Sequence, residues 1–137
     1  MIRGLDHVGI AVRDLDSAVK LWQQVAGATV THREVVDEQA VEVVMLRVGS
    51  LMIELIHPIS DDSPVARFLS SRGEGIHHIA LECESTPTEL DRARLEGAHL
   101  IDNSARIGAE QSHVGFVHPR SLVGVLLEFV DHAGPKE

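Results

Sequence analysis

The sequence predicts an α+β fold with two tandem modules, each a strand, a helix and then two or three strands, which form a curved mixed sheet (a half-barrel) with the helices on its outer face. Two internal similarities predict it. Residues 4–10 resemble residues 75–81, and residues 51–56 resemble residues 125–130, with offsets of 71 (78 − 7) and 74 (128 − 54). Within these segments the residue types alternate, which is typical of strands with two different faces. The chain therefore contains two related halves.

A helix is expected after the first strand of each half. Asp14 or Asp16 can cap the first helix. Thr86 opens a capping box with Pro87 at the first helical position and Glu89 three residues after the threonine. Spacing close to 3.6 residues predicts the apolar stripe that each helix turns toward the sheet. These stripes are Ala18, Leu21, Trp22 and Val25 in the first helix, and Leu90, Ala93, Leu95 and Ala98 in the second.

The remaining strands are expected near the end of each half. In the first half a tight turn at Gly49-Ser50 joins two of them, and a capped short helix lies on the linker between the halves. The expected strands cover residues 41–48, 51–57, 113–118 and 124–130. We expect a single domain over residues 1–137, with module 1 at about 1–58, the linker helix at about 59–74 and module 2 at about 75–132.

Composition restricts the function classes. The net charge of −9, with 12 Lys and Arg against 21 Asp and Glu, argues against a nucleic-acid surface, which needs clustered cations. Cys83 is the single cysteine, so we expect a buried inert thiol and a reducing cytoplasm. The first residues lack the apolar core of a signal peptide, and no apolar run approaches the roughly 20 residues of a membrane span. We expect a cytoplasmic protein without a membrane partner.

Four residues at equivalent positions of the halves suggest a metal site. The first similarity places His7 opposite His78, and the second places Glu54 opposite Glu128. A glutamate inside an apolar strand is costly to bury unless it is paired. A hydrogen-bonded core histidine is the alternative for either histidine alone, but two imidazoles with two carboxylates suit one divalent cation. The sequence does not choose among Co, Mn, Ni, Zn and Fe.

The same residues resemble the vicinal oxygen chelate superfamily, which includes glyoxalases, bleomycin-resistance proteins and dioxygenases. The resemblance implies two βαβββ modules in tandem, which pair to build a cupped metal site. Within it, the chain is most similar to methylmalonyl-CoA epimerases, over nearly its whole length. Histidine and glutamate on such strands are common to the superfamily, whereas four other motifs are more particular to the epimerases. These are Asp-Ser-Pro-Val-Ala at residues 62–66, His-His at 77–78, Phe-Val-His-Pro-Arg at 116–120 and Gly-Val-Leu-Leu-Glu at 124–128.

The resemblance implies an isomerase that epimerises methylmalonyl-CoA by α-proton transfer through a metal-stabilised enolate. It implies one divalent ion on the four residues above, an acyl-CoA substrate, a substrate-carboxylate contact from Ser112, and a homodimer. Glu128 is the expected base. Where some bacterial epimerases carry a second catalytic glutamate, this chain has Val43. Glu42 is adjacent but belongs to the other strand face, so Glu42, Glu38 and water stay open as the second base.

Two other functions stay open for the same residues. A glyoxalase-type isomerase would act on a glutathione hemithioacetal, which also requires proton transfer beside a metal-bound oxygen. A ligand-binding or resistance protein of the superfamily would hold its ligand without chemistry. The linker and C-terminal motifs disfavour the first alternative, and four metal-type side chains in an apolar cup disfavour the second.

Overall fold

The computed structural model describes residues 1–132, and its contacts divide the chain into two units. The first unit is His7–His77, and the second combines Met1–Asp6 with the chain from His78 onward. Strands β1 (Ile2–Ala11) and β5 (Gly75–Cys83) contribute residues to both units.

The first unit has the strand order β2-β3-β4-β1. Strand β3 is antiparallel to β2 and to β4, whereas β1 is parallel to β4. A helix is also present on the linker, capped by Ser63, whose side chain accepts a hydrogen bond from the Ala66 amide at 3.1 Å. The elements that follow β1 are α1 (Leu15–Ala26), β2 (Thr29–Val36), a 3₁₀ turn (Asp37–Gln39), β3 (Val41–Val48), β4 (Leu51–Pro58) and α2 (Pro64–Arg72).

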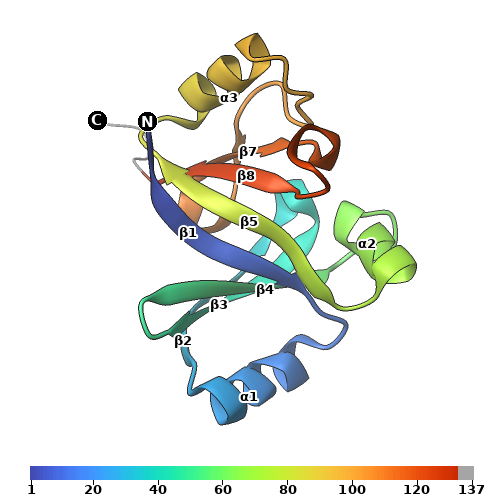
Figure 1. Cartoon of the computed structure of the whole chain (residues 1–137). Coiled ribbons are helices and arrows are strands. Elements are labelled where there is room, and N and C mark those ends of the chain that lie inside the picture. Colours follow the sequence, from blue (N-terminus) through green and yellow to red (C-terminus); the bar gives the residue numbers. More distant parts are fainter. Residues whose placement is uncertain (133–137) are drawn as a thin grey trace. The chain divides into compact units, whose positions relative to one another are not determined.

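The second unit repeats this plan with the strand order β5-β8-β7-β6. Strand β7 is antiparallel to β6 and β8, and β5 is parallel to β8. Its elements after β5 are α3 (Thr86–Leu95), β6 (Arg106–Ile107), a 3₁₀ turn (Ala109–Gln111), β7 (His113–Val117), a second 3₁₀ turn (Pro119–Leu122) and β8 (Leu127–Asp131). The predicted α+β class, with two βαβββ modules and a mixed sheet, is confirmed (Figure 1).

Two strand predictions need correction. The sequence pattern did not locate β2 and β6, because β2 has few buried residues and β6 covers only Arg106–Ile107. Strand β8 begins at Leu127 rather than at residue 124. The backbone of Val123 and Gly124 has positive φ angles of 50° and 96°, which interrupt extended pairing there.

Helix α1 begins after Asp14, whose carboxylate accepts a hydrogen bond from the Ser17 amide at 2.9 Å, and ends at Gly27 with a left-handed φ of 66°. The predicted stripe is wrong for Leu21 and Val25, which are 59% and 84% exposed. The helix turns a neighbouring face to the sheet, because two overlapping stripes of apolar residues were available. The residues on that packed face are Leu15, Ala18, Val19 and Trp22.

Helix α3 is capped one residue earlier than predicted. Ser85 accepts the hydrogen bond from the Thr88 amide, while the Thr86 hydroxyl donates to the carbonyl of His113 at 2.8 Å. Leu95 does not belong to the packed stripe, since it is 88% exposed. The other three predicted stripe residues, Leu90, Ala93 and Ala98, do pack in the core of this unit. Among the described residues, no helix has the length and apolarity that a membrane span requires.

Candidate metal site

The strand registers place one histidine and one glutamate in the same relation in both units. In the first unit, Glu54 of β4 lies opposite Gly9 of β1, two residues after His7. In the second unit, Glu128 of β8 lies opposite Ala80 of β5, two residues after His78. Because side chains alternate along a strand, each histidine projects from the same face as the residue paired with its glutamate.

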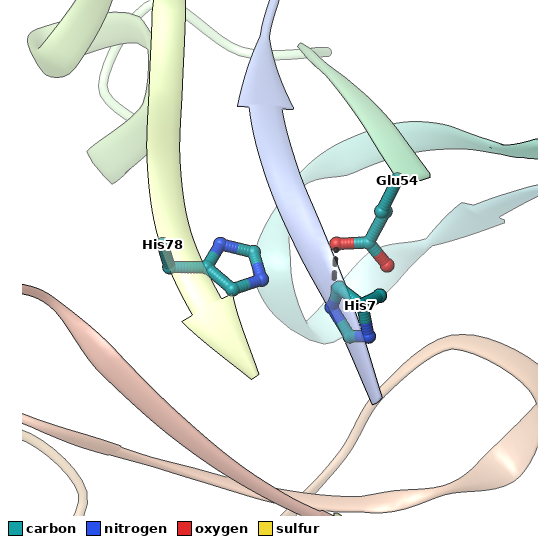
Figure 2. A group of neighbouring side chains, drawn as sticks. All are labelled: His7, Glu54 and His78. Carbon is teal, nitrogen blue, oxygen red and sulfur yellow. Dashed lines mark ion pairs between the residues drawn. The ribbon is translucent and has the colours of Figure 1, made fainter. Parts of the chain in front are cut away.

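Each histidine is close to the glutamate of its own unit. The Nε2 atom of His7 lies 3.5 Å from Oε1 of Glu54, and Nε2 of His78 lies 3.6 Å from Oε1 of Glu128. Figure 2 shows the first of these pairs, on β1 and β4, with a dashed line. All four residues are buried. Both distances exceed the roughly 2.7–2.9 Å of a strong charge-assisted hydrogen bond.

This spacing suits donor atoms that share an ion. Two ligand atoms at about 2.1 Å from one metal lie about 3.0 Å apart at an octahedral angle and about 3.4 Å apart at a tetrahedral angle. His7, Glu54 and His78 are side chains of the kinds that could hold a metal ion, and all three are buried. Imidazole nitrogen and carboxylate oxygen are ligands for Zn²⁺, Co²⁺, Ni²⁺ and Mn²⁺.

Small and apolar residues surround each pair. Gly9 and Ala80, the strand neighbours of the two glutamates, are buried and leave room beside the imidazoles. Phe116 lies opposite Glu128 in the β7–β8 register, and its ring meets that of His78 edge-on, with centroids 5.4 Å apart. Met45 has the corresponding position opposite Glu54. Sequence reasoning missed Phe116, although its offset of 71 from Met45 (116 − 45) repeats that of the histidines.

The structure places Glu42 away from the Glu54 face of its strand. Glu42 accepts a hydrogen bond from Nε of Arg33 at 3.0 Å and alternates with Val44, which packs in the core with α1. Val43 instead shares the face of Met45, the residue opposite Glu54. Glu38 is exposed in the 3₁₀ turn Asp37–Gln39. Glu42 and Val43 therefore lie on opposite faces of β3, as the strand alternation in the sequence predicted.

Ser112 is buried just before β7, and its hydroxyl donates to the carbonyl of Ala109 at 2.8 Å. Its contact with a substrate stays a prediction. His77, the neighbour of His78, has its ring edge-on to that of Phe68 at 5.0 Å, and burial lowers the pKa of His77. This packing agrees with the structural role that its place on the opposite strand face indicates.

The expected buried thiol is present. Cys83 packs with Leu90 and Phe129 in the core of the second unit, and burial raises the pKa of its thiol. Sequence reasoning missed two histidine–aspartate pairs in the same unit. His113 Nδ1 lies 3.0 Å from Asp131 Oδ1, and His132 Nε2 lies 2.7 Å from Asp6 Oδ1. Sequence separations of 18 and 126 residues gave no local signal for them.

Comparisons with known proteins agree with this arrangement. The model of the Glyoxalase/Bleomycin resistance protein/Dioxygenase superfamily matches residues 6–116. An uncharacterised protein of Bacillus subtilis strain 168, YqjC, is 39% identical over 130 residues, which are 95% of this chain and 93% of that protein. The crystal structure of methylmalonyl-CoA epimerase from Mycobacterium tuberculosis is 36% identical, with a TM-score of 0.92 over 96% of this chain and 89% of that one.

A second solved structure contains a ligand. It is a methylmalonyl-CoA epimerase in complex with methylmalonyl-CoA and NH₄⁺, 34% identical, with a TM-score of 0.93 over 97% of this chain and 96% of that one. The matches to these two structures cover 96% and 97% of this chain and therefore extend through both modules. The chain therefore belongs to the Glyoxalase/Bleomycin resistance protein/Dioxygenase superfamily and is homologous to methylmalonyl-CoA epimerases.

Proposed function

We propose that the protein is a metal-dependent isomerase that epimerises the α-carbon of methylmalonyl-CoA. The observation that carries the proposal is the repeated buried pair, His7 with Glu54 and His78 with Glu128, in the same strand register of both units. Two buried carboxylates of this kind are costly unless a positive charge compensates them. The complex of a homologue with methylmalonyl-CoA supports the choice of an acyl-CoA substrate.

His7, Glu54, His78 and Glu128 would together hold one divalent ion, with Co, Mn, Ni, Zn and Fe as the candidates. Figure 2 draws the first three of these side chains. When bound, the ion supplies Lewis acidity that stabilises the negative charge developing on the substrate oxygens as the α-proton leaves. Two imidazoles and two carboxylates would leave the bound divalent ion without net charge, which suits a buried site.

The chain's own groups would position the substrate and move the proton. We assign the base to Glu128, whose carboxylate would accept the proton from the α-carbon. The Ser112 hydroxyl would donate a hydrogen bond to the substrate carboxylate. Phe116 and Ala80 keep the surroundings of Glu128 apolar, which strengthens electrostatic interactions in the site.

The opposite face of the α-carbon needs a second proton carrier. Val43 lies on the appropriate strand face but has no group that can transfer a proton. Glu42 faces Arg33 on the other side of the strand, so we do not propose it. Glu38 and water are the two remaining candidates for this step.

Deuterium exchange tests the proposal directly. One stereoisomer of methylmalonyl-CoA is incubated in D₂O with metal-loaded protein, and α-deuterium and the opposite stereoisomer are followed by NMR. Glu128→Gln should lower the exchange rate by about 10²–10⁴, the usual loss for a general base. Glu42→Gln, the matched control, should lower it less than tenfold. No exchange by the wild type, or exchange lost in Glu42→Gln and kept in Glu128→Gln, would refute the assignment.

The same assay distinguishes the alternatives. Isomerisation of a glutathione hemithioacetal without exchange on methylmalonyl-CoA would indicate the glyoxalase-type reaction. Saturable ligand binding with no turnover of either substrate would indicate a binding protein. We also propose a homodimer, on the superfamily resemblance, and light scattering that gives a monomer at micromolar concentration would contradict it. The single-domain organisation and the cytoplasmic location stay predictions.

A further inference from the structure

The second unit contains a cavity that the His–Glu pair does not use. It has a volume of about 400 Å³ and lies between α3 and the sheet face formed by β5, β7 and β8. Its sheet wall contains Leu81, Val117, Leu127 and Phe129, with Ile2 of β1 beside them, and Ala93 of α3 lines the opposite side. Leu127 and Phe129 flank Glu128 in sequence, so they project from the opposite face of β8. The cavity is therefore separate from the candidate metal site.

Helices α1 and α3 correspond residue by residue. Their caps, Asp14 and Ser85, are 71 residues apart (85 − 14), and so are their first residues (86 − 15). This offset also relates their packed faces. It pairs Leu15 with Thr86, Ala18 with Glu89, Val19 with Leu90, and Trp22 with Ala93. The largest side chain that α1 packs on its sheet is thus replaced by one of the smallest in α3.

The sheet walls correspond as well. Leu81 and Val117 follow Ile10 and Leu46 by 71 residues (81 − 10 and 117 − 46). Leu127 and Phe129 follow Ile53 and Leu55 by 74 residues (127 − 53 and 129 − 55), the offset of the two glutamates. In the first unit, the residues that pack in one cluster with Trp22 are Ile10, Leu46, Ile53 and Leu55. The cavity therefore lies where an indole ring packs in the first unit.

The polar side chains around the cavity favour an uncharged occupant. Nε of Arg92 donates to Oε1 of Glu89 at 2.8 Å, and Oγ of Ser121 accepts from the His99 amide at 2.8 Å. Glu96 is the remaining charged lining residue and is exposed to solvent. The apolar side chains of the sheet wall offer no partner to a charged ligand, whereas a neutral aromatic ring can pack against them.

We propose that this cavity is a binding site for an uncharged planar aromatic molecule of about the size of indole. The volume falls within the roughly 300–1,000 Å³ of small-molecule sites. Apolar cavities lined by leucine and phenylalanine bind aromatic hydrocarbons when the side chain that would fill them is missing. The replacement of Trp22 by Ala93 at the equivalent position creates that situation here.

Titration with indole, followed by ¹H–¹⁵N NMR, tests the proposal. The wild type should show saturable shifts that centre on the amides of Leu81 and Phe129. Ala93→Trp should fill the cavity from α3, abolish these shifts and raise Tm, while epimerase activity stays at the wild-type level. Leu95→Trp is the matched control, because it adds the same side chain to the exposed face of α3. It should bind indole as the wild type does.

Leu122→Trp keeps the proposal testable if Ala93→Trp does not fold. Leu122 lines the cavity from the 3₁₀ turn, so an indole at this position should also block the titration. Absence of saturable binding in the wild type would overturn the proposal. Binding that survives in both folded cavity variants, or that is lost equally in Leu95→Trp, would overturn it too.

Discussion

Gly115 of β7 is the position where one added methyl group should report most directly on the packing of α3. A Cβ atom built there would lie 2.7, 2.9 and 3.1 Å from Cδ1, Cδ2 and Cγ of Leu90. Carbon atoms in contact prefer about 3.5–4.0 Å. Leu90 is only 1% exposed and packs against Val117 and Phe129. It therefore has little space into which it can move.

The expected cost follows from this clash. Adding a methylene to a packed core usually costs about 1–3 kcal/mol, and Gly115→Ala should lie in this range. For a chain of this length that corresponds to a Tm lower by roughly 3–15 °C. Leu90→Ala alone should cost about 2–5 kcal/mol, because it removes a buried side chain and leaves a cavity. In the double variant the clash is gone, so Gly115→Ala should add almost nothing.

Urea unfolding of the four proteins measures this cycle. The coupling free energy between Gly115→Ala and Leu90→Ala should be favourable by about 1–3 kcal/mol. Leu95→Ala, on the exposed face of the same helix, is the control and should change the free energy of unfolding by less than about 0.5 kcal/mol. Additive effects of Gly115→Ala and Leu90→Ala would refute the packing described between α3 and β7.

Three further predictions concern the metal and two titratable groups. A divalent ion at 100 times its Kd should stabilise the wild type by about 2.7 kcal/mol in thermal unfolding, and Glu54→Gln should respond much less. Because its hydrogen bond to Asp6 raises the pKa of His132, that contact should stabilise the fold below about pH 6.5 and lose its effect as pH rises through the raised value. At pH 5.5 the free energy of unfolding of the wild type should exceed that of His132→Gln by less than about 1 kcal/mol, because the pair is partly exposed. This difference should shrink as the pH rises to 8.5. Burial raises the pKa of the Cys83 thiol, so this thiol should react slowly with a disulfide reagent until urea unfolds the chain. Rapid labelling of the native protein would contradict this.

Features that depend on local chemistry and on repetition could be predicted from the sequence alone. Strand alternation separates His7 from Val8 and Val43 from Glu42, because successive side chains point to opposite faces. The repeated offsets place His7 and His78, and Glu54 and Glu128, at equivalent positions of the two halves. This inference needs no knowledge of the contacts in the folded chain. These features need only the period of a strand and the residue types on it, so they could be predicted.

Features that depend on a packing partner emerge only in the folded chain. Two apolar stripes overlap on α1, and only the sheet beneath it selects Leu15 and Val19 over Leu21 and Val25 as packed residues. The parallel registers of β1 with β4 and of β5 with β8 set each histidine beside its own glutamate, over separations that leave no local signal. The edge-on contact of Phe116 with His78 and the cavity beside Ala93 arise in the same way. Packing depends on the shape of both surfaces, and a sequence pattern describes only one of them at a time.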